Sequence, residues 1–148
     1  MGTTGALYYS ADVMPHAVII GKPLLNLGNI AANETKFRPG GFPTSVDVLL
    51  KTMGKTDLEA INRLNEKIWN KVKNADYSET KFIVSYMIED DYDMEAYKKL
   101  IEGLSSTGVH IYGKGLHGRH NDDTHGIIYW FSSRYKSVIR EDFRREIE

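Results

Sequence analysis

The sequence predicts an α+β fold, in which a mostly antiparallel sheet carries helices packed on one face. An alternating apolar run over residues 80–89, with apolar side chains on both faces, predicts a central strand. Apolar residues at helical spacing over 56–75 predict an amphipathic helix. Two more strand-like runs, 109–112 and 126–132, flank a glycine-rich segment, which favours a hairpin. The second half of the chain therefore resembles part of a split βαβ sandwich.

The N-terminal elements are predicted from propensity and turn residues. Residues 6–20 are rich in tyrosine, valine and isoleucine and predict one or two strands interrupted by Pro15. Residues 21–43 combine many glycines and prolines with no clear period, so we expect a long irregular segment there. A short helix over 44–53 should follow, ended by Gly54.

Capping signals place the later helices. Thr56-Asp-Leu-Glu59 is a capping box and opens a helix that runs to about residue 75. Asp93 is predicted to cap the helix after the central strand, and a final helix is predicted from about 135 to 147.

Composition limits the class of protein. With 148 residues, 41% hydrophobic and 26% charged, the chain is expected to form a single α+β domain over residues 1–148. A net charge of -1 argues against a polybasic coat for nucleic acid or membranes, although a local basic patch stays compatible with it. The absence of cysteine excludes disulfides, thiolate metal sites and a cysteine nucleophile. With no signal peptide and no apolar span of roughly 20 residues, we expect a cytoplasmic protein.

The main candidate site is a glycine-punctuated segment over residues 113–126. Four of the five histidines lie between residues 110 and 125, and three of them belong to this segment. Histidine changes its charge near neutral pH and is a frequent metal ligand. Acidic and basic side chains accompany the histidines, so the segment combines acids, bases and cations.

The leading hypothesis is binding of a phosphate-bearing ligand, either a nucleotide or nucleic acid. The glycines would expose backbone N–H groups to an anion, and the cations would add charge-assisted contacts. Two histidines would serve as general acid and base if a phosphodiester is cleaved. The expected ligand-binding residues are Lys114, Gly115, Arg119, Asp122, Asp123, Lys36 and Arg38, and the expected catalytic residues are His117, His120 and His125.

The first alternative is a metal-dependent hydrolase. His117 and His120 would place two imidazoles on one divalent ion, with Asp122 and His125 completing the ligand set. No cofactor is certain from the sequence, because residues 121–123 also have good turn chemistry without any metal.

The second alternative is a non-catalytic oligomeric module that sequesters a ligand or inhibits a protein partner. The leucines of segment 21–43 and the aromatic strands would supply its interface, so we expect a homo-oligomer that does not bind membranes. Asp90, Asp91 and Asp93, after the central strand, fit either a capped turn or a cation site. Whether the protein is an enzyme stays open at this level.

Overall fold

The computed structural model describes residues 2–37, 41–105, 108–122 and 124–147, and it shows an α/β architecture. Its sheet consists of β1 (Ala17–Gly21), β2 (Lys81–Met87) and β3 (Ile111–Leu116), in the order β1-β2-β3. Both strand pairs are parallel. The expected antiparallel sheet is therefore wrong, whereas the central position of β2 is confirmed.

Helical crossovers explain the parallel sheet. The chain leaves β1 and passes through α2 (Leu27–Lys36), α3 (Pro43–Met53) and α4 (Leu58–Lys73) before it enters β2. It then passes through α5 (Asp91–Leu104) before β3. A crossover helix returns the chain to the same end of the sheet, so the next strand runs in the same direction. The C-terminal half is thus not a split βαβ sandwich.

The predicted strand over 126–132 is wrong, and with it the predicted hairpin. These residues form the beginning of α6 (Thr124–Ile147). Ile127 and Trp130 are buried, and their spacing of three is helical, while Ile128 and Tyr129 between them are exposed. Strand propensity was a poor guide here because side-chain burial along a single helical stripe decides the structure.

The first predicted strand is also mostly helical. Residues Gly2–Val13 form α1, and only Ala17–Gly21 of the predicted 6–20 region is a strand. Leu7 and Ser10 lie buried at helical spacing on the inner face of α1. The ring of Pro15 falls between the two elements, where it disturbs neither.

The supposedly irregular segment 21–43 contains α2. The leucines that were expected to supply an interface, Leu24, Leu25 and Leu27, are instead in the core. Helix α3 agrees with the predicted 44–53 helix and ends at Gly54, whose φ of 69° lies in the left-handed region that glycine adopts easily.

Two helix caps differ by a few residues from those predicted. Helix α4 begins after Asp57, whose side chain accepts the N–H of Ala60, rather than at Thr56. Helix α5 begins after Asp90, whose carboxylate accepts the N–H groups of Tyr92 and Asp93. Asp93 is therefore not the N-cap and lies inside the helix, fully buried.

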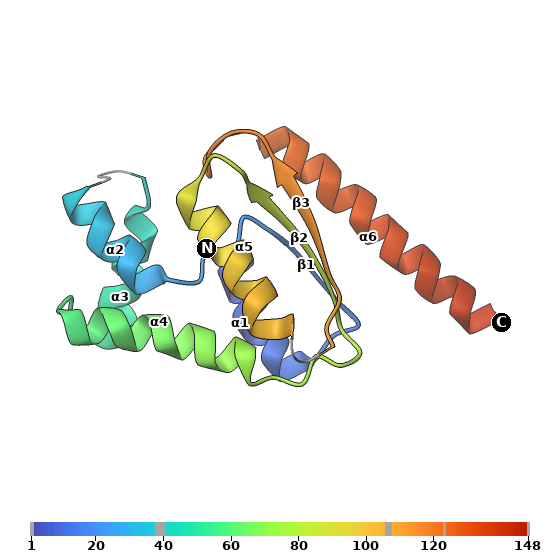
Figure 1. Ribbon diagram of the computed structural model, residues 1–148, viewed down its shortest axis with the longest axis horizontal. Helices are drawn as coiled ribbons and strands as arrows, with labels where there is room; N and C mark the ends of the chain where they lie inside the picture. Colours follow the sequence, from blue (N-terminus) through green and yellow to red (C-terminus); the bar gives the residue numbers. More distant parts are fainter. Residues whose placement is uncertain (1, 38–40, 106–107, 123, 148) are drawn as a thin grey trace.

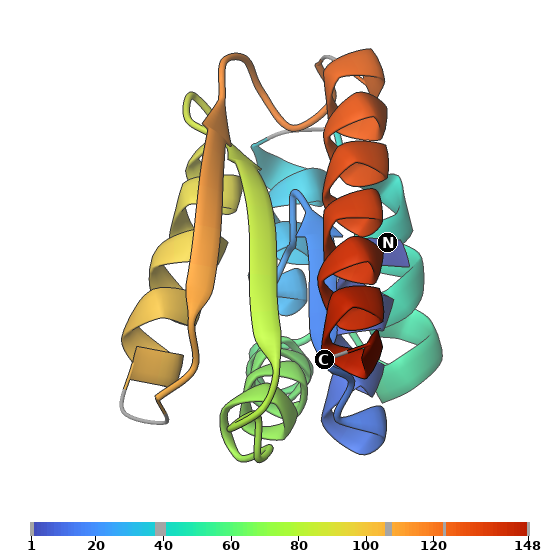
Figure 2. The same cartoon turned by 90° about the vertical axis from the view of Figure 1, so that its right-hand side faces the viewer.

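The helices cover both faces of the sheet, not one. Figure 1 shows α1 and α5 on one face and α6 on the other, with α2, α3 and α4 as a helical group farther from the strands. In Figure 2, α6 lies along β1, and β2 and then β3 lie farther from this helix. In the described part of the chain, no helix combines the length and apolar character needed to cross a membrane. The single-domain organisation stays a prediction.

Candidate functional site

Charged side chains gather where the parallel strands end. Lys22 follows β1 directly, Glu89 and Asp90 follow β2, and His117 and His120 follow β3. Because the strands are parallel, all their carboxyl ends lie at one edge of the sheet, where α/β proteins place their ligands. Topology thus brings together groups that are up to 98 residues apart in the chain.

The central pair of this edge is His120 and Asp93. His120 Nδ1 lies 2.5 Å from Asp93 Oδ1, and the carboxylate is fully buried in the first turns of α5. The other carboxylate oxygen of Asp93 accepts the backbone N–H of Met87 at 2.9 Å. A carboxylate can only accept, so His120 donates from Nδ1 and a neutral ring keeps the lone pair on Nε2. This arrangement orients a histidine to act as a base.

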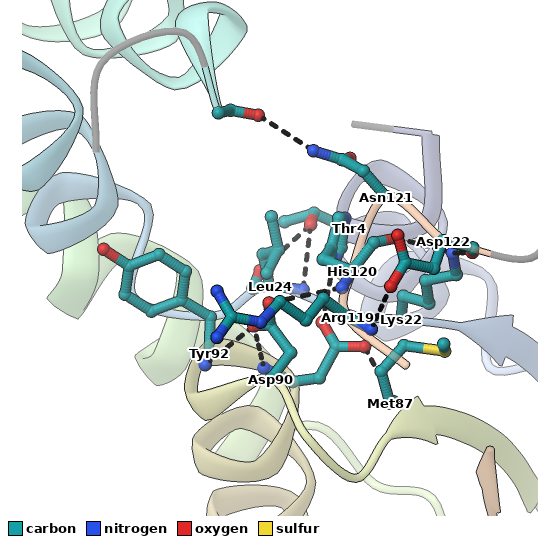
Figure 3. A network of polar contacts seen from close by, with 12 residues as sticks. Thr4, Lys22, Leu24, Met87, Asp90, Tyr92, Arg119, His120, Asn121 and Asp122 are labelled. Atoms are coloured by element: carbon teal, nitrogen blue, oxygen red, sulfur yellow. Dashed lines mark hydrogen bonds and ion pairs between the residues drawn. The ribbon is translucent and has the colours of Figure 1, made fainter. Parts of the chain in front are cut away.

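The backbone around His120 is held from three sides, as Figure 3 shows. Asp90 accepts the N–H of His120 at 3.2 Å, and Lys22 Nζ donates to the carbonyl of His120 at 2.5 Å. Within the loop, the N–H of Arg119 donates to the carboxylate of Asp122, and the N–H of Asp122 donates to the carbonyl of Arg119, each at 2.8 Å. Arg119 and Asp122 thus build the turn that presents the histidine.

A cavity of about 260 Å³ opens beside His120. Thr3 and Thr4 in the first turn of α1 line it together with His120. The first N–H groups of a helix lack partners within the helix, so this turn offers donors to a developing negative charge. No residue in the described part of the chain is hydrogen-bonded to Nε2 of His120. The ring of Phe42 packs 5.0 Å from the histidine ring, between centroids.

His117 belongs to a second, solvent-facing pair. Its Nδ1 lies 3.0 Å from Glu89 Oε1, and the side chain of His117 is 87% exposed. Gly118 donates its N–H to the other carboxylate oxygen of Glu89. These hydrogen bonds, that of His117 first, lower the pKa of Glu89 below its usual range. An imidazole so exposed is poorly shielded from water and less suited to directed proton transfer than His120.

The remaining predicted residues do not converge on this edge. Lys114 and Gly115 lie within β3, and Lys114 lines a cleft of about 360 Å³ between the sheet and α6. His125 is exposed in the first turn of α6, and Lys36 is exposed in the last turn of α2. Arg38 and Asp123 lie outside the described residues.

The glycines of this region have a packing role that the sequence did not reveal. A Cβ on Gly113 would collide with the hydroxyl of Tyr97, and one on Gly115 would press at 2.7 Å on Ile88. Gly113 and Gly115 therefore let β3 pass close under side chains of the α5 face. They are strand residues, not an anion-binding loop.

The expected metal ligands do not form one group, because three of them are hydrogen-bonded to different partners. His120 is paired with Asp93, His117 with Glu89, and Asp122 closes its own turn. Among the residues that the structure describes, no group of three histidine, aspartate or glutamate side chains could hold a metal ion.

Sequence reasoning missed Asp93, Glu89 and Lys22 as members of the site. The acidic cluster after the central strand was visible, but it suited a capped turn equally well. Once β2 and β3 are known to be parallel neighbours, acids after one strand and histidines after the next become the informative signal.

Comparison with known proteins shows what this chain is similar to. The profile of one family, described as "Accessory Sec system GspB-transporter", matches residues 1–145. An accessory Sec system protein of Streptococcus gordonii is 42% identical over 146 residues, which are 99% of this chain and 29% of the relative. The chain thus spans less than a third of the curated relative.

Two solved structures are also similar to this chain. A chain of the Glycosylation Associate Protein (Gap123) complex from Streptococcus agalactiae matches with a TM-score of 0.87 and 39% identity, over 96% of this chain and 28% of that one. The capsule O-acetyltransferase of Neisseria meningitidis serogroup A matches with a TM-score of 0.68 and 18% identity, over 94% of this chain and 52% of that one. At this identity, the second likeness shows the fold alone.

These findings correct the functional expectations. The relatives are accessory Sec system proteins, and one similar chain is part of a protein complex. The predictions of a nucleotide- or nucleic-acid-binding protein, of a phosphodiesterase or metal-dependent hydrolase, and of an oligomeric sequestering module are therefore wrong.

Proposed function

Because the chain belongs to the accessory Sec system GspB-transporter family, we propose that it works in that system beside protein partners and supplies the histidine and carboxylate of an acyl-transfer site. One observation carries the chemical part of this proposal. His120 lies against the buried carboxylate of Asp93 at 2.5 Å, and no described residue is hydrogen-bonded to its Nε2.

The proposed chemistry follows from this pairing. Nε2 of His120 takes the proton of an attacking hydroxyl while the oxygen of that hydroxyl bonds to an acyl carbonyl carbon. Asp93 keeps the imidazole in the correct tautomer and stabilises the imidazolium that forms. The carbonyl is then restored as the bond between the acyl carbon and the leaving group breaks, and His120 returns the proton to the leaving group.

The carbonyl oxygen becomes negatively charged during this step and needs donors. The first turn of α1, with Thr3 and Thr4, faces the same 260 Å³ cavity as His120. Free N–H groups at a helix N-terminus stabilise such an oxyanion without having to reorient. Base and oxyanion donors on one cavity support acyl transfer over simple proton transfer.

The chain order of the groups supports the same reaction class. Among α/β enzymes with a Ser-His-Asp triad, one group has the nucleophile first, then the acid, then the histidine. Here the acid, Asp93 after β2, precedes the histidine, His120 after β3, in the same order. The proposal assigns the acid and the histidine to this chain, which spans 29% of its curated relative.

Substitution in the full-length protein tests this proposal. Release of 4-nitrophenolate from 4-nitrophenyl acetate is measured for wild type, His120→Ala and Asp93→Asn. Both variants should lose about 10³- to 10⁴-fold in kcat, because each removes a member of the proton-transfer pair. His110→Ala is the matched control, since His110 is exposed near the opposite end of β3. A His120→Ala protein as active as wild type would disprove the proposal.

The cellular part has its own test. Cells lacking the gene are complemented with wild type, and export of the accessory Sec cargo and co-purification of the partner subunits are measured. Restored export with recovered partners supports the assignment, and export that does not depend on the gene contradicts it. The cytoplasmic location predicted from the sequence stays a prediction within this proposal.

A further inference from the structure

The segment 22–24, directly after β1, connects the two halves of the proposed site. On one side, Thr4 Oγ1 donates to the carbonyl of Leu24 at 2.9 Å and accepts the N–H of Leu24 at 3.3 Å. On the other side, Lys22 Nζ donates to the carbonyls of His120 at 2.5 Å and Asp122 at 2.7 Å. Figure 3 shows this chain of contacts running from the first turn of α1 to the histidine loop.

The backbone of Lys22 is unusual for a lysine. Its φ of 53° lies in the left-handed region, which residues with a Cβ adopt at an energetic cost. Its N–H donates to the carbonyl of Ser85 at 2.8 Å, so this conformation is tied to β2. Two residues later, Leu24 is hydrogen-bonded to Thr4 of α1. The lysine side chain reaches the two carbonyls of the 120–122 turn.

Besides Lys22, three hydrogen bonds to described residues hold that turn against the rest of the protein. Asp90 accepts the backbone N–H of His120, and Asp93 accepts a hydrogen bond from the His120 ring. The side-chain amide of Asn121 donates to the carbonyl of Gly41 at 3.4 Å. Lys22 Nζ donates to two carbonyl oxygens of the same turn. A charge-assisted donor shared by two carbonyls is stronger than a neutral hydrogen bond.

We propose that Lys22 is a positioning residue, which sets the distance between the imidazole of His120 and the N–H groups of the first turn of α1. This inference rests on the proposed acyl-transfer function. Lys22 itself does not touch the acyl group. It acts through the carbonyls of the turn, while Thr4 and Leu24 fix the opposite end of the same segment. Loss of the lysine donors leaves both catalytic groups present but no longer held at a constant separation.

The test compares three variants of the full-length protein. Lys22→Met keeps the length of the side chain and removes its donors, Lys22→Arg keeps donors, and Lys22→Gly suits the positive φ while removing the side chain. Lys51→Met, on the exposed face of α3, is the control. The main readout is the low-field NMR signal of the His120 Nδ1 proton in ¹⁵N-histidine-labelled protein, assigned with His120→Ala.

We expect Lys22→Met and Lys22→Gly to lose or broaden this signal, and Lys22→Arg and the control to keep it. In 4-nitrophenyl acetate cleavage, kcat of Lys22→Met should fall about 10- to 100-fold with KM little changed, because a small misplacement of a base costs rate rather than binding. An unchanged His120 signal in both donor-free variants would overturn the inference. If wild type itself shows no acyl transfer, the proposed function fails, whereas the NMR result still decides the role of Lys22.

Discussion

His120 Nδ1 lies 2.5 Å from Asp93 Oδ1, so an imidazole from the loop after β3 is held by a carboxylate buried in the helix after β2. Asp93 also accepts the N–H of Met87 with its second oxygen. One side chain thereby connects the last residue of the central strand to the histidine loop.

Asp93→Asn should lower the free energy of unfolding by about 1–3 kcal/mol. An amide has one acceptor oxygen, so either Met87 N–H or His120 Nδ1–H would face an NH₂ group in a buried place. Urea unfolding at neutral pH measures the loss. Asp47→Asn, on the exposed side of α3, is the control and should change stability little. Equal stability of both variants would show that the buried carboxylate is not needed as a double acceptor.

The pair of Glu89 and His117 predicts a pH response of the loop. The hydrogen bond of His117, followed by that of Gly118, lowers the pKa of Glu89. A lowered carboxylate pKa means that the contact contributes fully above the ordinary glutamate pKa and is lost as the pH falls through the lowered value. His117→Ala should move the pKa of Glu89 upward in a ¹³C carboxyl titration by NMR. An identical titration curve in wild type and variant would contradict this assignment of the cause.

Tyr77 predicts a decline of stability in alkali. Burial raises the pKa of Tyr77, whose hydroxyl lies 2.9 Å from Ser10 Oγ, which lowers the pKa less strongly. The folded state therefore keeps the phenolic proton longer, and stability falls as the pH rises above about 10, the ordinary tyrosine pKa.

Tyr77→Phe should make that alkaline decline shallower. At neutral pH it should cost about 0.5–1.5 kcal/mol, because Ser10 loses a buried partner. Urea unfolding at neutral and alkaline pH measures both effects. Tyr129→Phe is the control, since Tyr129 is 80% exposed on α6. A Tyr77→Phe protein whose alkaline decline is as steep as that of wild type would refute the prediction.

Two glycine-to-alanine substitutions should change the stability of the protein in opposite directions. A Cβ on Gly28 of α2 would collide with the carbonyl oxygen of Ile61 and lie 2.9 Å from Asn65 Oδ1. Since a backbone atom cannot move away cheaply, Gly28→Ala should destabilise by about 1–3 kcal/mol.

Gly5 is the matched control because nothing lies within 4 Å of a Cβ there. Gly5→Ala in the interior of α1 should stabilise by about 0.5–1 kcal/mol through helix propensity. Thermal unfolding separates the two outcomes. If both variants lose stability, the close packing of α2 on α4 is not the cause.

Local signals predicted several elements well. Helix α3 with its terminal Gly54, helix α4 and the central strand β2 follow from patterns within a few residues. The run over 126–132 misled because isoleucine, tyrosine, tryptophan and phenylalanine have strand propensity, which burial against the sheet overrides. The predicted antiparallel direction of the strands was wrong for the same reason, because it relied on a hairpin between two consecutive strands.

The candidate site was predicted only in part. The segment after β3 was recognised as chemically unusual, and His120 stays in the proposed site. Its partner Asp93 was considered only as a helix cap or a cation ligand. The glycines of the segment suggested anion binding, whereas Gly113 and Gly115 are explained by the close approach of Tyr97 and Ile88.

The sequence by itself determined where α3, α4 and β2 lie and which segment holds the histidines, because capping residues and apolar periods act over a few positions. Only the tertiary structure decided that the strands are parallel, that 126–132 is helical and that His120 meets Asp93. These features depend on contacts between residues far apart in the chain, such as His120 with Asp93, 27 positions away, and with Lys22, 98 positions away. The physical reason is that a side chain's partner is set by the packing of whole elements, which no local pattern encodes.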